Sequence, residues 1–173
     1  ITATQDKKKI CSSCLGIFVV LYIMAIMTIE ELRNVAVFRD LPDEQLQWIV
    51  DHSNYHEYED GSLIKKTGDE ADVMLIIIEG RINFYMDIHG RLVYYLSFGN
   101  DEQTGGVSGL LPYSRMKTYP GSSFAGGKLR TLQLEKKYFA ELEQLNPGLI
   151  QRLIGYMTER AKAFATLQTQ QEK

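Results

Sequence analysis

The residues best suited to bind a ligand lie in one glycine-rich loop. Three glycines fall within five positions of the run Gly105, Gly106, Val107, Ser108, Gly109, Leu110 and Leu111. Glycine lets a backbone turn sharply and approach a ligand, so that N–H groups can face an anion. The nearest cations, Arg115 and Lys117, could pair with a phosphate or a carboxylate. The loop therefore predicts an anion site, with ordinary turn glycines and solvated loop charges as the alternative.

Residues for catalysis or metal binding are not grouped. The three histidines fall in a predicted helix end, a strand and a hairpin turn: His52, His56 and His89. No two of them stand one residue apart, as a metal site on a β-strand would need. Cys11 and Cys14, the only cysteines, lack the second ligand pair or the βαβ context of a metal or redox motif. We expect no catalytic residue, no metal site and no enzymatic activity.

Length and composition predict one globular domain with a helical appendage. The chain has 173 residues, of which 45% are hydrophobic and 24% charged, enough to build a buried core. The net charge of -3 does not suit a dedicated nucleic-acid binder, which is usually strongly basic. We expect no nucleic-acid partner and a cytoplasmic location, with a membrane-anchored form as the alternative.

The N-terminal segment 1–29 differs from the rest of the chain. Lys7, Lys8 and Lys9 precede an uncharged stretch from Ile10 to Ile29, which is long enough to cross a bilayer as an anchor. A second interpretation is that Met27 is the natural start and the residues before it are not native. A third is a packed hydrophobic helix. Segment 1–29 is therefore kept apart from the domain that follows.

The middle of the chain reads as strands and turns after two short helices at 28–38 and 42–51. From Tyr55 onward, glycines recur every 7 to 12 residues, which is typical of a strand-and-turn meander. Predicted strands are near-continuously apolar at 73–80 and alternating at 81–86 and 129–134. Residues 87–91 form a hairpin turn in which Gly90 supplies a positive φ.

Two helices are expected after the strands. The first covers 135–145, and Pro147 fixes the start of a second that reaches the C-terminus. The apolar stripe of this second helix is Leu149, Leu153, Met157, Phe164 and Leu167. Its last two members lie beyond the expected edge of the barrel, which predicts a homodimer through this helix. Region 147–173 is thus expected to be a dimerisation and signal-output linker.

The joint order of these pieces resembles the cyclic-nucleotide-binding domain of the catabolite activator family, cyclic-nucleotide-gated channels and kinase regulatory subunits. The resemblance covers about residues 30–165. It implies a mainly β fold with flanking helices: a double-stranded β-helix, or jelly roll, of eight strands within 30–146, then a long C-terminal helix. It also implies a turn and a short helix over 104–118 beside the pocket, with Ile82 and Phe84 among the strand residues that line it.

The family's ligand residues do not carry over. In the family a Glu accepts from the ribose 2′-hydroxyl, while an Arg and backbone N–H groups neutralise the cyclic phosphate. Aligned backward from Ala125, the Glu falls on Leu110 and the Arg near Tyr119. Aligned on Leu110 and Leu111 as the helix leucines, the Glu falls on Val107. Both registers put an aliphatic residue where the ribose acceptor should stand.

A missing acceptor costs roughly 1–3 kcal/mol of binding. We therefore expect weak or absent binding of the usual cyclic nucleotides and a pocket that takes a different small anion. No obligatory cofactor is predicted. The candidate ligand is a cyclic nucleotide or another phosphorylated small molecule.

The loop sequence at 109–116 is most similar to a bacterial subgroup in which this domain precedes a sensor histidine kinase. The resemblance implies a regulatory, ligand-sensing domain of a two-component signal-transduction protein, with a degenerate site and any kinase activity outside this chain. Two alternatives remain: a domain that binds no ligand and serves dimerisation or docking, and a true cyclic AMP or cyclic GMP regulator.

Overall fold

The computed structural model describes the backbone of residues 29–171 and the side chains of residues 29–162. Segment 1–28, with its two cysteines and the question of an anchor, lies outside the described residues, as do the side chains of Phe164 and Leu167. Among the described helices, none has the length and hydropathy needed to cross a membrane.

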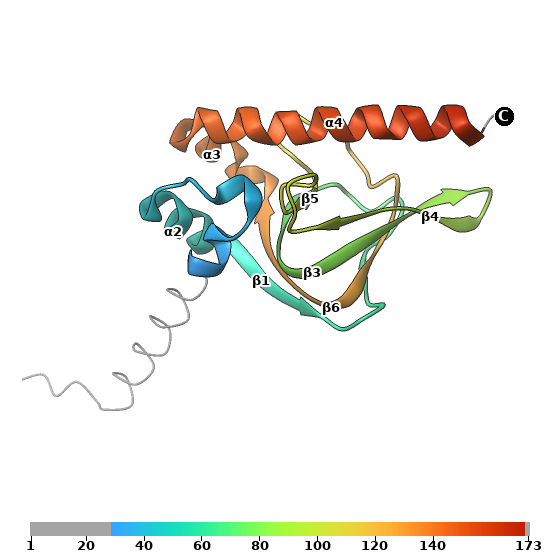
Figure 1. Cartoon of the computed structure of the whole chain (residues 1–173), viewed down its shortest axis with the longest axis horizontal. Helices are drawn as coiled ribbons and strands as arrows, with labels where there is room; N and C mark the ends of the chain where they lie inside the picture. Colours follow the sequence, from blue (N-terminus) through green and yellow to red (C-terminus); the bar gives the residue numbers. More distant parts are fainter. Residues whose placement is uncertain (1–28, 172–173) are drawn as a thin grey trace, which may run out of the picture.

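The described strands form one antiparallel sheet that rolls on itself (Figure 1). They are β1 (Ser53–Tyr58), β2 (Leu63–Lys65), β3 (Val73–Ile88), β4 (Arg91–Gly99), β5 (Val107–Gly109) and β6 (Gly121–Glu135). The path runs β1-β6-β3-β4, while β2 pairs with β6 and β5 pairs with β3. The mainly β jelly-roll fold is therefore confirmed. Eight strands were expected and the described residues contain six. The number is smaller because β3 and β6 are long and stay paired through a register shift around Glu79.

Strand β3 is apolar on both faces because each face meets its own core. Met74 and Ile76 pack with the helices in one core. Leu75 and Ile77 point the other way, into the interior of the roll. Side chains of a strand alternate between faces, so a strand covered on both sides reads as a continuous apolar run. That is why the run at 73–78 carries no alternation.

The hairpin between β3 and β4 has the expected turn. His89 and Gly90 both have positive φ, at 53° and 78°, which suits a two-residue turn between twisted strands. The Gly90 N–H donates to Asp87 Oδ1 at 2.8 Å. Glycine at the second position therefore meets a backbone requirement.

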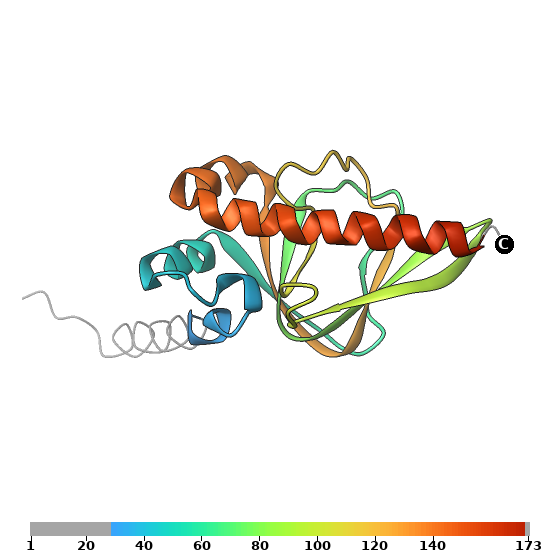
Figure 2. The ribbon, with the colours of Figure 1, turned by 45° about the horizontal axis from the view of Figure 1, so that its top comes forward.

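Helices pack against the roll before and after the strands (Figure 1). A helix over 29–33, η1 (Ala36–Phe38) and α2 (Asp43–Asp51) come first. The helix expected at 28–38 is thus broken into two pieces. After β6 come η2 (Lys136–Tyr138), α3 (Phe139–Leu145) and α4 (Pro147–Gln171). Figure 2 shows α4 running across the roll.

Helix α4 begins at Pro147, as expected, and its first half is clamped to the domain. Asn146 Oδ1 accepts from the Leu149 N–H at 2.9 Å, and Asn146 Nδ2 donates to Gln45 Oε1 at 2.8 Å. This cap fixes the helix start and ties it to α2. Leu149 and Leu153 are fully buried in the helix-side core.

The expectation of a short helix within 104–118 is wrong. Residues 102–106 form a turn, 107–109 form β5, and no helix follows before β6. Strand β5 pairs with β3, with Leu75 opposite Ser108. Val107 is fully buried in the helix-side core, and Leu110 packs in a separate cluster with Ala71 and Tyr119. Pairing of β5 with β3, together with the burial of Val107 and Leu110, holds this segment in an extended conformation.

Gly80 gives a test of the bend in β3. Its φ is +84°, and a Cβ there would lie 2.3 Å from the Lys128 carbonyl oxygen. We expect Gly80→Ala to lower the free energy of unfolding by about 3 kcal/mol, since the left-handed φ alone costs about 1–2 kcal/mol and a backbone atom cannot move aside easily. Gly61→Ala is the matched control, because Gly61 has φ +75° and open space around it. Urea unfolding measures both, and equal losses would contradict the prediction.

Candidate ligand site

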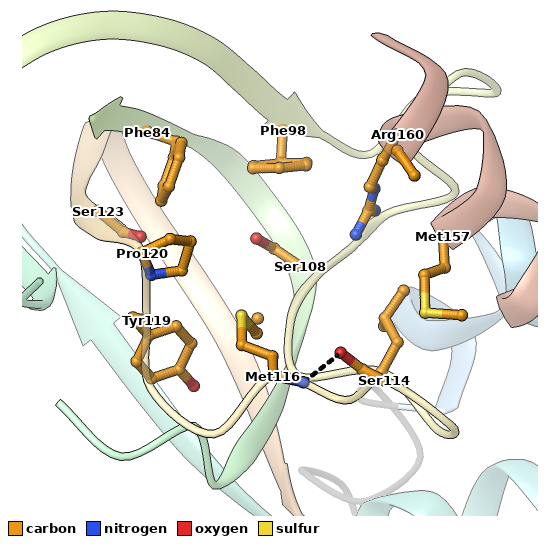
Figure 3. A pocket seen from close by; sticks show the side chains of 13 residues that line it. Phe84, Phe98, Ser108, Ser114, Met116, Tyr119, Pro120, Ser123, Met157 and Arg160 are labelled. Carbon is orange, nitrogen blue, oxygen red and sulfur yellow. Dashed lines mark hydrogen bonds between the residues drawn. The ribbon is translucent and has the colours of Figure 1, made fainter. Parts of the chain in front are cut away.

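A cavity of about 230 Å³ lies between the roll and α4 (Figure 3). Strands β3, β4 and β5, the segment before β6, the start of β6 and α4 all contribute to its wall. The wall is mostly apolar, with the side chains of Phe84, Phe98, Leu111, Met116, Pro120 and Met157. Its hydroxyls belong to Ser108, Ser114, Tyr119 and Ser123. A concave, apolar space with few polar groups is the usual form of a small-molecule site.

Arg160 of α4 is the charged residue that lines this cavity. In Figure 3 its guanidinium points toward the space between Phe98 and Met116. Its Nη2 donates to the carbonyl oxygen of Thr104 at 2.9 Å and to that of Val107. The guanidinium carbon lies 4.6 Å from the centre of the Phe98 ring, within range of a cation–π contact. The C-terminal helix is thereby fastened to the glycine-rich loop and to β4.

The charge of Arg160 is incompletely compensated. Burial lowers the pKa of Arg160 to about 10, so the side chain is still cationic at neutral pH. Its Nε is buried without a hydrogen-bond partner. Within the described residues no carboxylate forms an ion pair with it, and nearby Asp101 is paired with Arg81 at 3.7 Å. Its direct described contacts are carbonyl oxygens and one aromatic ring, and the charge of Asp101 acts on it only from a distance.

The loop that receives Arg160 is built around Asp101. The Asp101 Oδ1 accepts from the Thr104 N–H at 2.9 Å, and the Asp101 carbonyl accepts from the Gly105 N–H at 2.8 Å. The Gly105 and Gly106 carbonyls accept from the N–H groups of Val37 and Ile77, at 3.1 and 2.8 Å. The loop is therefore tied to η1 and to β3, and it is rigid where α4 reaches it.

The glycines of the loop serve packing. A Cβ on Gly105 would lie 2.5 Å from Tyr156 Cε2 of α4, and one on Gly106 would lie 2.4 Å from Val35 Cγ1. A Cβ on Gly109 would lie 2.7 Å from the Val73 carbonyl oxygen. All three have positive φ. They let the loop approach α4, the N-terminal helices and β3 more closely than any other residue would allow.

Four of the residues predicted from the sequence line the cavity: Phe84, Ser108, Gly109 and Leu111. Ile82 is buried in the interior of the roll. Gly105, Gly106 and Val107 lie on the side of the loop that packs against Tyr156, Val35 and the helix-side core. These residues shape the site from behind.

The loop cations lie elsewhere. Arg115 and Lys117 are exposed, and neither lines the cavity under α4. Lys117 borders a more polar pocket with Glu70 and Lys136, and Leu110 borders it too. The structure therefore does not bring the two predicted cations to the cavity, and the cation found there comes from α4.

Tyr119 occupies the place where one register put the family's Arg. It is 4% exposed, and its hydroxyl donates to the Val73 carbonyl at 3.3 Å. Burial raises the pKa of Tyr119 to about 12, so the group is neutral. Leu110 and Val107, the two positions for the family's Glu, are buried among apolar side chains. Neither register supplies a phosphate cation or a ribose acceptor.

Sequence reasoning missed Arg160, although a signal was present. It falls between Met157 and Phe164 on the apolar stripe, three residues after the one and four before the other. Burying a charged residue at an apolar helix position costs free energy unless hydrogen bonds or an opposite charge compensate it, so such a residue indicates a specific contact. Phe98, Met116 and Met157 had no comparable signal, because only the folded chain brings them together.

Comparison with known proteins agrees with this fold. No family model matches the chain. It is 25% identical over 120 residues to the cAMP-activated global transcriptional regulator CRP of Salmonella typhimurium, covering 68% of this chain and 55% of that protein. The chain thus spans about half the length of the curated relatives that it matches.

Solved structures show the likeness in space. The sensor domain of the transcriptional regulator DNR from Pseudomonas aeruginosa has a TM-score of 0.64 at 15% identity, covering 79% of this chain and 90% of that one. A cyclic nucleotide-binding domain from Methylobacillus flagellatus has a TM-score of 0.63 at 17% identity, covering 87% and 84%. At such identities the likeness shows the fold, which is that of cyclic-nucleotide-binding domains.

Proposed function

We propose that this chain is the ligand-sensing regulatory domain of a signal-transduction protein such as a sensor histidine kinase, and is not itself an enzyme. The observation that supports it is the position of Arg160, which lines the cavity and also fastens α4 to the loop. A ligand in the cavity must meet this side chain. Occupancy of the cavity and attachment of α4 are therefore linked.

The two halves of α4 are held differently. Leu149 and Leu153 fix the first half in the core, whereas Tyr156 and Met157 are partly buried and Lys162 is exposed. Arg160 is thus the last strong attachment along the described side chains. A ligand that draws the guanidinium away from the Thr104 and Val107 carbonyls changes how the second half of α4 leaves the roll, and with it whatever α4 is joined to.

The histidine kinase part of the proposal rests on the resemblance of the loop at 109–116 and on the helical course of the chain to Gln171. The partial coverage of the relatives is compatible with an output domain beyond this region. A true cyclic AMP regulator is the second candidate, supported by the cAMP-activated relative. A docking role is the third, supported by Leu92 and Tyr94 on β4, which are 52% and 55% exposed.

Hydrogen exchange of α4 tests the sensor function. Arg160→Gln should speed exchange of the amides at 158–165 and of the loop at 104–107, because the helix loses its charge-assisted bonds to the loop. Amides at 149–154 should not change. Lys162→Gln is the matched control on the same helix, since Lys162 pairs with Glu159 on the exposed face. A ligand found by thermal-shift screening should alter the same two segments, and binding without any change in α4 would contradict the proposal.

Binding of cyclic AMP should be weak. With Val107 or Leu110 at the acceptor position, we expect a dissociation constant no tighter than about 100 μM, or a ΔG near −5.5 kcal/mol. Titration calorimetry measures it. The control ligand is 2′-deoxy cyclic AMP, which should bind equally well because no residue reads the 2′-hydroxyl. Low-micromolar binding with a clear preference for the ribose form would favour the cyclic nucleotide regulator instead.

We also propose that the domain is a homodimer through the C-terminal helix, with Phe164 and Leu167 on the apolar stripe. Sedimentation at high micromolar concentration should give a dimer for the wild type. The double variant Phe164→Glu, Leu167→Glu should give a monomer. Like charges would repel across the interface, and the apolar contacts of the two replaced side chains would be lost. A wild type that sediments as a monomer like the variant would rule this out.

A further inference from the structure

We infer that the cavity takes a compact apolar monocarboxylate, such as an aromatic acid, whose carboxylate pairs with the guanidinium of Arg160. This inference rests on the proposed function and adds the chemical class of the ligand. It is carried by the charge at the end of the cavity, by the character of the walls and by the available space.

The charge at Arg160 calls for an anion. Its guanidinium points into the cavity, one of its nitrogens is buried without a partner, and no described carboxylate pairs with it. A buried cation is costly unless an anion or a full set of hydrogen bonds compensates it. A carboxylate matches the planar guanidinium with charge-assisted hydrogen bonds. The ligand's acid group therefore supplies the opposite charge that no described carboxylate provides through an ion pair.

The walls favour a single negative charge on an apolar body. Phe84, Phe98 and Met116 surround the space in front of the guanidinium, with the Ser108 hydroxyl among them (Figure 3). One guanidinium neutralises one negative charge, so a phosphate dianion would leave excess charge in an apolar enclosure. A ribose and a purine would also bring more hydroxyl and amino groups than the few hydroxyls of these mostly apolar walls can satisfy. An apolar body needs no hydrogen-bond partner from the walls.

The volume sets the size of that body. A dry apolar cavity of about 150 Å³ accepts one benzene molecule. At about 230 Å³, the cavity has room for one such ring with a short acid arm. Cyclic AMP carries two base rings, a ribose and a phosphate ring, so it would fill this space and extend out of the cavity. The size and the walls thus point to the same class of ligand.

Calorimetry on the full chain with phenylacetate as the probe tests this. Phenylacetate should bind about tenfold or more tightly than phenylacetamide, which has the same shape without the charge. Arg160→Gln should abolish that preference, Arg160→Lys should keep part of it because the charge remains, and Lys162→Gln should leave it intact. The acid-to-amide comparison on the wild type needs no variant to fold.

The outcomes separate the ligand class from the sensor function. Equal binding of acid and amide, or tighter binding of cyclic AMP or inorganic phosphate, would overturn the carboxylate assignment while leaving a sensor in place. Acid binding that keeps its preference in Arg160→Gln would also overturn it, because the carboxylate would then pair elsewhere. A different result would contradict the sensor function: compounds of any chemical class would bind without changing hydrogen exchange in α4.

Discussion

The burial of one guanidinium organises the functional half of this domain. Arg160 joins α4 to the carbonyls of Thr104 and Val107 and stacks near Phe98 of β4. Those carbonyls belong to a loop that is itself tied to η1 and β3 through Gly105 and Gly106. The contact therefore connects the last helix, the first helices and the sheet.

This attachment has a defined geometry but includes no ion pair among the described residues. The Arg160 cation leaves water and gains hydrogen bonds to neutral carbonyls, with no carboxylate in return, and burial lowers the pKa of the side chain accordingly. In the proposed mechanism this contact suits a helix that a bound anion releases, because a carboxylate would offer the cation an opposite charge that the carbonyls lack.

Local patterns made most of the fold predictable, while the site depends on long-range packing. The alternating strands, the turn at Gly90 and the start of α4 at Pro147 follow from neighbours in sequence, and the structure has them. The number of strands did not follow, because pairing between β3 and the distant β6 continues through the register shifts around Glu79. The helix expected within 104–118 failed for a similar reason, since β3 recruits β5 into the sheet.

The candidate site could be predicted in part for the same physical reason. From the loop at 104–111, Ser108, Gly109 and Leu111 do line the cavity. Its cation was sought nearby in sequence, at Arg115 and Lys117, whereas folding brings Arg160 from α4. In the family that the sequence resembles, the anion is held by the loop and the following strand, where this chain has neutral Tyr119. In the proposed site the anion is held by the helix that carries the output. Ligand affinity and helix position then depend on one interaction. If the ligand shifts the equilibrium between attached and released α4 by some factor, thermodynamic reciprocity requires that a partner joined to α4 which favours one of these states changes the ligand's affinity by the same factor.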